Sequence, residues 1–209
     1  MKKIYLLLLF SFFARDLCSQ HLQWDWAKEY GHGYGQEVKA IAADSFGNCF
    51  VAGYFNGDTI RFRNIFLSSG VPFSQQHFFV AKFDSAGYTL WAKTSASNTG
   101  NEKATAVAVD GDGNCYVVVQ FVATLIIGND TLTNNGSGGD LCLIKYDTAG
   151  NILWMKQIKS SSLDVVLGMT VDGLGNSFIT GNYSGDSLTF DNTSIYMYPL
   201  TWIQVGFYF

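Results

Sequence analysis

The sequence predicts an all-β repeat protein, and three observations lead to this fold class. The phrase Asp-x-x-Gly-Asn, followed by an aromatic or β-branched run, occurs three times, with its aspartate at Asp44, Asp110 and Asp172. The spacings of 66 and 62 residues are regular enough to indicate an internal repeat. A second phrase, Trp-x-Lys, recurs with almost the same period, and no stretch after the first twenty residues shows the apolar period of an amphipathic helix.

The composition agrees with short strands joined by glycine turns. Of the 209 residues, 16% are aromatic and only 14% are charged, whereas about 25% are charged in a typical soluble domain. The chain has 22 glycines and 2 prolines. This balance suits a β-rich fold with a sizeable core and argues against disorder.

The first repeat shows how one unit is organised. A small-residue strand at 38–43 precedes the Asp44 turn, an aromatic strand returns at 50–55, and an inserted hairpin is expected between residues 58 and 69. A third strand at 78–83 leads through a second Asp-x-x-Gly turn to the Trp-x-Lys strand at 89–93. Four antiparallel strands in a meander, with small residues in the first, are typical of one β-propeller blade.

The period divides the chain into segments. We expect a lead-in strand at 20–37, blade repeats at 38–96 and 97–160, and a third repeat at 161–209 that is truncated or divergent at its C-terminus. Strand three of that last repeat should begin near residues 202–205, but the lysine, the aspartate turn and the closing Trp-x-Lys are not found there. The prediction is therefore about two and a half blades.

An incomplete set of blades leaves open strand edges, which tend to pair with other chains. Since propellers need about four blades or more, three explanations remain. The sequence is a truncated or frameshifted gene product, or the protomer completes a ring by oligomerisation, or the blades form an open array.

The segment at 1–19 is predicted to be a secretory signal peptide. Two lysines precede an apolar stretch at residues 4–14, and small residues follow where a peptidase could cut. The apolar stretch is shorter than the roughly 20 residues needed to span a bilayer. We therefore expect export and no transmembrane segment after cleavage.

The net charge argues against a nucleic-acid partner, and the cysteine positions argue against disulfide bonds. The chain has a formal charge of −4, and the part after the signal peptide is more acidic, so nucleic acid is not an expected partner. Three cysteines follow residue 19, an odd number that cannot pair completely. Cys49 and Cys115 occupy the same repeat position, and Ser177 takes it in the third repeat, which indicates packing rather than a disulfide.

The repeated phrases, taken together, resemble a known family. Ala-x-Asp-x-x-Gly-Asn-x-[Phe/Tyr]-Val, then Val-Ala-Lys-[Phe/Tyr]-Asp-x-x-Gly, then Leu-Trp-Ala-Lys are similar to the SBBP repeat, which is named for a seven-bladed β-propeller and is frequent in secreted proteins of Bacteroidota. The resemblance covers most of residues 22–190. It implies that the chain is a fragment, and that a complete relative has further blades and a C-terminal sorting domain. It also implies a bacterial protein, secreted or at the cell surface.

A calcium site is a weak candidate at the second copy of the turn. Asp110, Asp112 and Asn114 place oxygen-bearing side chains at alternating positions, as in the start of a calcium loop. The other two copies lack the middle carboxylate, and a structural hairpin is the alternative. The three histidines are scattered without metal-ligand spacing, so no other metal and no cofactor is expected.

Twelve positions recur with the repeat and are expected to be structural. They are Asp44, Gly47, Asn48, Asp110, Gly113, Asn114, Asp172, Gly175, Asn176, Trp26, Trp91 and Trp154. The tryptophans could stack on sugars, but a fixed place in every unit favours packing between blades.

The function expected from these patterns is that of a non-enzymatic scaffold or interaction module at the cell surface, binding a protein or glycan, with self-association through open blade edges. The alternatives are a lectin-like propeller that binds carbohydrate, and a propeller hydrolase or lyase. Exposed aromatic residues that differ between repeats would favour the lectin. Carboxylates converging at the axial end of the small-residue strands would favour the enzyme.

Overall fold

The computed structural model describes residues 26–30, 35–70, 75–96, 101–134, 136, 138–162, 164–183, 185–196 and 203–208. The signal peptide predicted at 1–19 lies outside these residues. Every regular element in the described part is a β-strand, and all pairings are antiparallel, so the predicted all-β class of incomplete propeller-like blades is confirmed. Among the described residues there is no helix long and apolar enough to cross a membrane.

The first blade is a four-stranded sheet in the order β1-β2-β5-β6. Its strands are β1 (Gln36–Ala43), β2 (Cys49–Asn56), β5 (Gln76–Phe83) and β6 (Thr89–Thr94). The inserted hairpin forms a separate two-stranded sheet from β3 (Thr59–Phe62) and β4 (Ile65–Ser68). Alternation along β3, in which Ile60 and Phe62 are buried and their neighbours are exposed, packs this hairpin on the blade.

The second blade repeats this meander and is extended by two further strands. It contains β7 (Glu102–Val109), β8 (Cys115–Phe121), β11 (Asp140–Tyr146) and β12 (Ile152–Ser160), and its inserted hairpin is β9 (Thr124–Ile127) with β10 (Asp130–Thr133). Because β12 is longer than β6, its end also pairs with β15 (Ser187–Phe190), which is followed by β16 (Thr193–Tyr196). The hairpin of the third repeat thus completes a six-stranded sheet with the second blade.

The third blade has one strand more than the sequence pattern predicts. Besides β13 (Val165–Val171) and β14 (Ser177–Tyr183), it contains β17 (Ile203–Tyr208), which pairs with β14 from Ile203 opposite Tyr183 to Tyr208 opposite Phe178. This strand lies where strand three belongs, although the Lys-[Phe/Tyr]-Asp phrase is missing. An antiparallel ladder is built from backbone groups, so the phrase is not needed for the strand to form.

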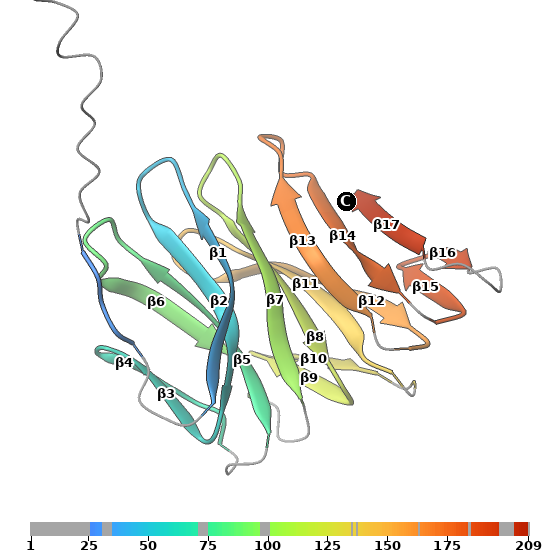
Figure 1. Cartoon of the computed structure of the whole chain (residues 1–209), viewed down its shortest axis with the longest axis horizontal. Coiled ribbons are helices and arrows are strands. Elements are labelled where there is room, and N and C mark those ends of the chain that lie inside the picture. The colour runs from blue at the N-terminus through green and yellow to red at the C-terminus, as the bar shows by residue number, and fades with distance from the viewer. Residues whose placement is uncertain are drawn as a thin grey trace, which may run out of the picture.

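The first strands of the blades lie side by side, with β7 between β1 and β13 (Figure 1). The three sheets follow one another along the long axis, from residues 26–30 at one end to β17 at the other (Figure 1). Each first strand carries a register shift at the same repeat position, between Val38 and Ala40 in β1 and between Ala104 and Ala106 in β7. A bulge of this kind increases the local twist. The shift between Val166 and Gly168 in β13 repeats it, so the first strands of all three blades carry the same local irregularity.

Two apolar cores hold the blades together. Phe50 and Trp91 of the first blade pack with Val117, Ile144 and Tyr146 of the second, and all five are buried. The next core joins the second blade to the third, through residues that include Tyr116, Val118, Leu143 and Ile179. Burying one such side chain contributes roughly 1.5–3 kcal/mol, so stacking of the sheets is a large part of the stability. Cys49, Cys115 and Cys142 are free thiols.

Candidate interaction surface

The Asp-x-x-Gly-Asn turn is closed by its own side chains. In the first copy the Oδ1 atom of Asp44 accepts the backbone N–H groups of Phe46 and Asn48, at 2.9 and 2.8 Å. Its Oδ2 atom accepts the side-chain amide of Asn48 at 2.7 Å. Gly47 follows at a φ of 81°, which a residue with a Cβ rarely adopts. The aspartate, glycine and asparagine are therefore needed for the turn, whereas the residues between them are free to vary.

The same bonds recur at Asp110 and Asp172, and also at a turn that the sequence analysis describes only as Asp-x-x-Gly. Asp147 accepts the N–H groups of Ala149 and Asn151 and the amide of Asn151. Because Asn151 directly follows Gly150, residues 147–151 read Asp-x-x-Gly-Asn, and this turn is a fourth copy of the phrase. Asp84 makes the backbone bonds alone, because Tyr88 takes the asparagine position.

A lysine of the third strand lies against the first turn of its own blade, a contact that the repeated phrases do not predict. The Nζ atom of Lys145 is 3.2 Å from Asp110 Oδ2 and 4.7 Å from the ring centroid of Tyr116. Lys82 is placed in the same way beside Asp44 and over Phe50. Burial acts to raise the pKa of Asp110, but the hydrogen bonds from Asn114 and the Lys145 ammonium outweigh it and hold that pKa below its ordinary value.

These contacts leave little of the Asp110 carboxylate for a calcium ion. Both oxygens accept hydrogen bonds from the turn, and Oδ2 is also close to Lys145 and to the hydroxyl of Tyr116, at 3.2 Å each. Calcium would have to replace the lysine. Within the described ranges no group of three or more His, Cys, Asp or Glu side chains is arranged to hold a metal ion. The geometry of Asp110 and Asn114 supports the structural hairpin.

The tryptophans of the Trp-x-Lys phrase connect neighbouring blades. Trp91 of β6 donates its indole N–H to the carbonyl of Thr148, in the second turn of the next blade, at 3.1 Å. Its ring covers Gly150, where a Cβ atom would lie 2.9 Å from Trp91 Cδ2. Trp26 makes the same contact one unit earlier, donating to the carbonyl of Ser85 at 2.8 Å.

Residues 26–30 therefore contact the first blade in the way that β6 contacts the second. Besides the Trp26 bond, Lys28 donates to the carbonyl of Ala86 and the Tyr30 hydroxyl donates to the carbonyl of Gly87. These residues are not paired into a sheet. They occupy the place of the fourth strand of a blade that would precede the first.

The face of the first blade that points away from the second is open. Val38 and Ile41 of β1 are 58% and 69% exposed. Their repeat equivalents in β7, Ala104 and Val107, are 0% and 6% exposed because the first blade covers them. Since large exposed apolar side chains in a cluster mark interaction sites, this face is the candidate interaction surface.

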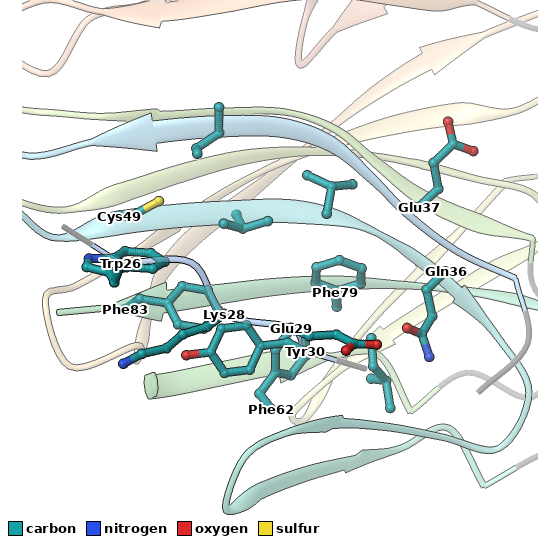
Figure 2. A pocket seen from close by; sticks show the side chains of 14 residues that line it. Trp26, Lys28, Glu29, Tyr30, Gln36, Glu37, Cys49, Phe62, Phe79 and Phe83 are labelled. Atoms are coloured by element: carbon teal, nitrogen blue, oxygen red, sulfur yellow. The ribbon is translucent and has the colours of Figure 1, made fainter. Parts of the chain in front are cut away.

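The surface contains a pocket of about 470 Å³ between residues 26–30 and the sheet. Figure 2 shows Trp26 and Tyr30 on the segment that crosses the strands, with Phe62, Phe79 and Phe83 beside them. Cys49, Val51 and Ile60 also line the pocket, so its walls are mainly apolar.

Charged groups lie at the rim. Glu37 is at one end of the pocket (Figure 2) and accepts hydrogen bonds from Lys39 and Tyr54, which lower its pKa. Lys28 and Glu29 lie on the crossing segment. An apolar centre with a charged rim is the usual plan of a protein interface.

The third tryptophan, Trp154, has no turn of a following blade to bind within the described part of the chain. Its ring meets Tyr116 of its own blade edge to face, at 5.8 Å between centroids. Lys156 pairs instead with Asp191, at 2.7 Å. The connection that Trp26 and Trp91 make is therefore not repeated by the described residues at this end.

A buried polar cluster lies between the first two blades and is another feature that the sequence analysis does not identify. His77 Nδ1 is 4.0 Å from Glu102 Oε2, both side chains are fully buried, and Ser95 donates to the same carboxylate. Burial lowers the pKa of His77. The three residue types are those of a hydrolytic triad, but full burial keeps a substrate away from them.

Comparisons with known proteins agree with the fold. No family model matches the chain. An uncharacterized WD repeat-containing protein of Acanthamoeba polyphaga mimivirus is 25% identical over 200 residues, which cover 80% of this chain and 14% of that protein. The chain thus spans 14% of the length of the curated relative it matches. With the stacked sheets described above, this similarity supports the conclusion that the chain is a repeat protein built of β-propeller-like blades.

Proposed function

We propose that the chain is a secreted, non-enzymatic repeat module of the SBBP type that binds a protein partner at the bacterial cell surface through the open face of its first blade. The observation that carries this proposal is the exposure of Val38 and Ile41, compared with the burial of Ala104 and Val107 at the same repeat positions. An apolar face of this kind favours a protein partner, because it offers few hydrogen-bonding groups to a sugar.

The two alternative functions find less support at this surface. The indole N–H and ring of Trp26 are used on Ser85 and Gly87, so this side chain is committed to packing rather than to stacking on a sugar. The aspartates at the ends of the small-residue strands accept hydrogen bonds from their own turns, as at Asp44 and Asp172. Such carboxylates are poorly placed for acid–base chemistry on a glycan.

Cell fractionation of the source bacterium tests the proposal. We expect the protein outside the cytoplasm, retained on washed cells, and lost to the medium when Ile41→Asp places a charge on the open face. Leu153→Asp is the matched control, because Leu153 is an exposed apolar residue of the middle blade. Cytoplasmic protein would contradict export, and equal retention of wild type and Ile41→Asp would contradict the role of this face.

A further inference from the structure

Cations and aromatic rings alternate in a row where the inserted hairpin of the first blade meets the turn before β6. The guanidinium of Arg61 lies over the ring of Phe66, with 4.8 Å between Cζ and the ring centroid. The Nε atom of Arg61 donates to the carbonyl of Arg63 at 2.6 Å. Over the ring of Tyr88 lie both the guanidinium of Arg63, at 4.5 Å, and the ammonium of Lys28, at 4.0 Å. We call these five residues the cationic row.

The cationic row is accessible to a ligand. All five residues are exposed, and the two rings, Phe66 and Tyr88, are 64% and 47% exposed. Strands β3 and β4, which carry Arg61 and Phe66, lie beside β6 at the end of the molecule far from β17 (Figure 1). The row thus follows the β6 edge of the first blade.

The three cations of the row are held in place without being neutralised. Within the described part of the chain, neither the two arginines nor Lys28 forms an ion pair, whereas Lys145 and Lys156 are each paired with an aspartate. A cation over an aromatic face is attracted by the ring, which restricts its motion but leaves its charge. The row therefore presents three positive charges in a chain whose formal charge is −4.

The repeat shows that the fold does not require the cationic row. The second blade forms the same hairpin, from β9 and β10, and the same turn before its fourth strand. At the positions of Arg61, Phe66 and Tyr88 it has the uncharged and non-aromatic residues Ile126, Thr131 and Asn151. Packing of the hairpin on the blade thus does not explain why the first copy carries the row.

The backbone of Arg63 supports the same conclusion. Arg63 has a φ of 55°, and the residues at its position in the next two hairpins are Gly128, at 62°, and Asp191, at 46°. A glycine takes this left-handed conformation freely and an aspartate tolerates it, whereas an arginine is strained by its Cβ atom. Strain of this kind is typical of residues whose side chains have a function.

We propose that the cationic row binds an anionic polysaccharide, carboxylated or sulfated, along the β6 edge of the first blade. A guanidinium matches a carboxylate or sulfate group with two parallel hydrogen bonds. The apolar face of a sugar ring packs on an exposed aromatic ring such as Phe66. A polymer in which sugar rings and charges alternate therefore matches a row in which aromatic rings and cations alternate. An acidic peptide would satisfy the charges but not the rings. This site is separate from Val38 and Ile41 and goes beyond the proposed function.

Binding of the purified chain to immobilised polysaccharides tests this. We expect binding to polygalacturonate, which carries carboxylates, or to dextran sulfate, and none to neutral dextran. The affinity should fall as salt is added, because exposed ion pairs are screened. Poly-glutamate, which has the charge without the sugar rings, should bind at least about fivefold more weakly. Equal binding of poly-glutamate would overturn the assignment to a polysaccharide.

Two substitutions locate the site. Arg61→Gln and Arg63→Gly should each weaken binding about fivefold, the effect of losing one exposed ion pair. Lys159→Gln, which removes an exposed lysine of the second blade, is the matched control and should bind as the wild type does. Arg63→Gly places the residue of the second blade at the strained position, so we expect it to unfold at no lower urea concentration than the wild type. Its weaker binding then does not come from a loss of folding. A wild type that binds neither charged polysaccharide overturns the proposal, and so do Arg61→Gln and Arg63→Gly variants that bind like Lys159→Gln.

Discussion

Two glycines with a positive φ, Gly150 and Gly128, differ in what surrounds them. Because Trp91 packs on Gly150, we predict that Gly150→Ala destabilises the protein more than Gly128→Ala does. Gly150 has a φ of 82° and lies under Trp91, where a Cβ atom would be 2.9 Å from Trp91 Cδ2 and 2.9 Å from Lys93 Cε. Gly128 has a φ of 62°, but a Cβ atom there would meet nothing within 4 Å. Gly128→Ala therefore serves as the control for backbone strain alone.

The magnitudes follow from the two geometries. A left-handed φ costs about 1–2 kcal/mol for a residue with a Cβ, which is the whole loss expected for Gly128→Ala. Gly150→Ala adds overpacking of about 1–3 kcal/mol. Displacing the indole also weakens its hydrogen bond to Thr148, a loss of about 1 kcal/mol. We expect Gly150→Ala to destabilise the protein by about 2–4 kcal/mol more than Gly128→Ala does.

Urea denaturation monitored by tryptophan fluorescence measures both variants. With an m value of about 1–3 kcal/mol/M, a difference of this size separates the urea midpoints of the two variants by about 0.7 M or more. Equal midpoints for Gly128→Ala and Gly150→Ala would refute the inferred packing of Trp91 on the next blade. A Trp91→Ala variant as stable as the wild type would also contradict this packing, because that substitution removes the same contact from the other side.

Three further predictions concern charges and the core. Lys145→Met removes the ammonium beside the buried Asp110 carboxylate, which keeps its hydrogen bonds to the turn, and should cost about 1.5–3 kcal/mol. Lys156→Met breaks an exposed pair and should cost less than about 1 kcal/mol in the same urea assay. Ile144→Ala, in the core between the first two blades, should cost about 2–5 kcal/mol, and an unchanged melting temperature would contradict that core. Because burial lowers the pKa of His77 below its unfolded value, the unfolded state binds more protons; stability should fall as pH drops below about 6.5, and His77→Gln should flatten this dependence.

The local chemistry of the turns is what made the fold predictable from sequence. A tight turn that needs a positive φ at Gly47 and an acceptor at Asp44 restricts its residues strongly, so the phrase survives in every copy and reveals the period. Strands follow between the turns with little ambiguity, because an aromatic or β-branched run cannot continue through such a turn. The inserted hairpins were predictable for the same reason, from the alternation of residues such as Ile60 and Phe62.

The features that depend on distant neighbours were not predictable in this way. The sequence around Lys145 does not distinguish it from other lysines in strands, and its role follows only from its contact with Asp110 in the folded chain. Ile41 and Val107 occupy the same repeat position in similar sequences, and only the presence or absence of a preceding blade makes one exposed and the other buried. Strand β17 lacks the phrase of its counterparts and is recognised only by its pairing with β14.

Thiol labelling tests most directly whether the first blade covers the second while its own outer face is open. Cys49 and Cys115 occupy equivalent positions on these two blades. Cys49 lines the open pocket and is partly exposed, whereas Cys115 is fully buried under the first blade, and burial raises the pKa of both thiols. The native chain is treated with a maleimide, and each cysteine-containing peptide is followed by mass spectrometry. We predict modification of Cys49 well before Cys115. Equal rates at the two cysteines would contradict a first blade that covers the second and is itself uncovered.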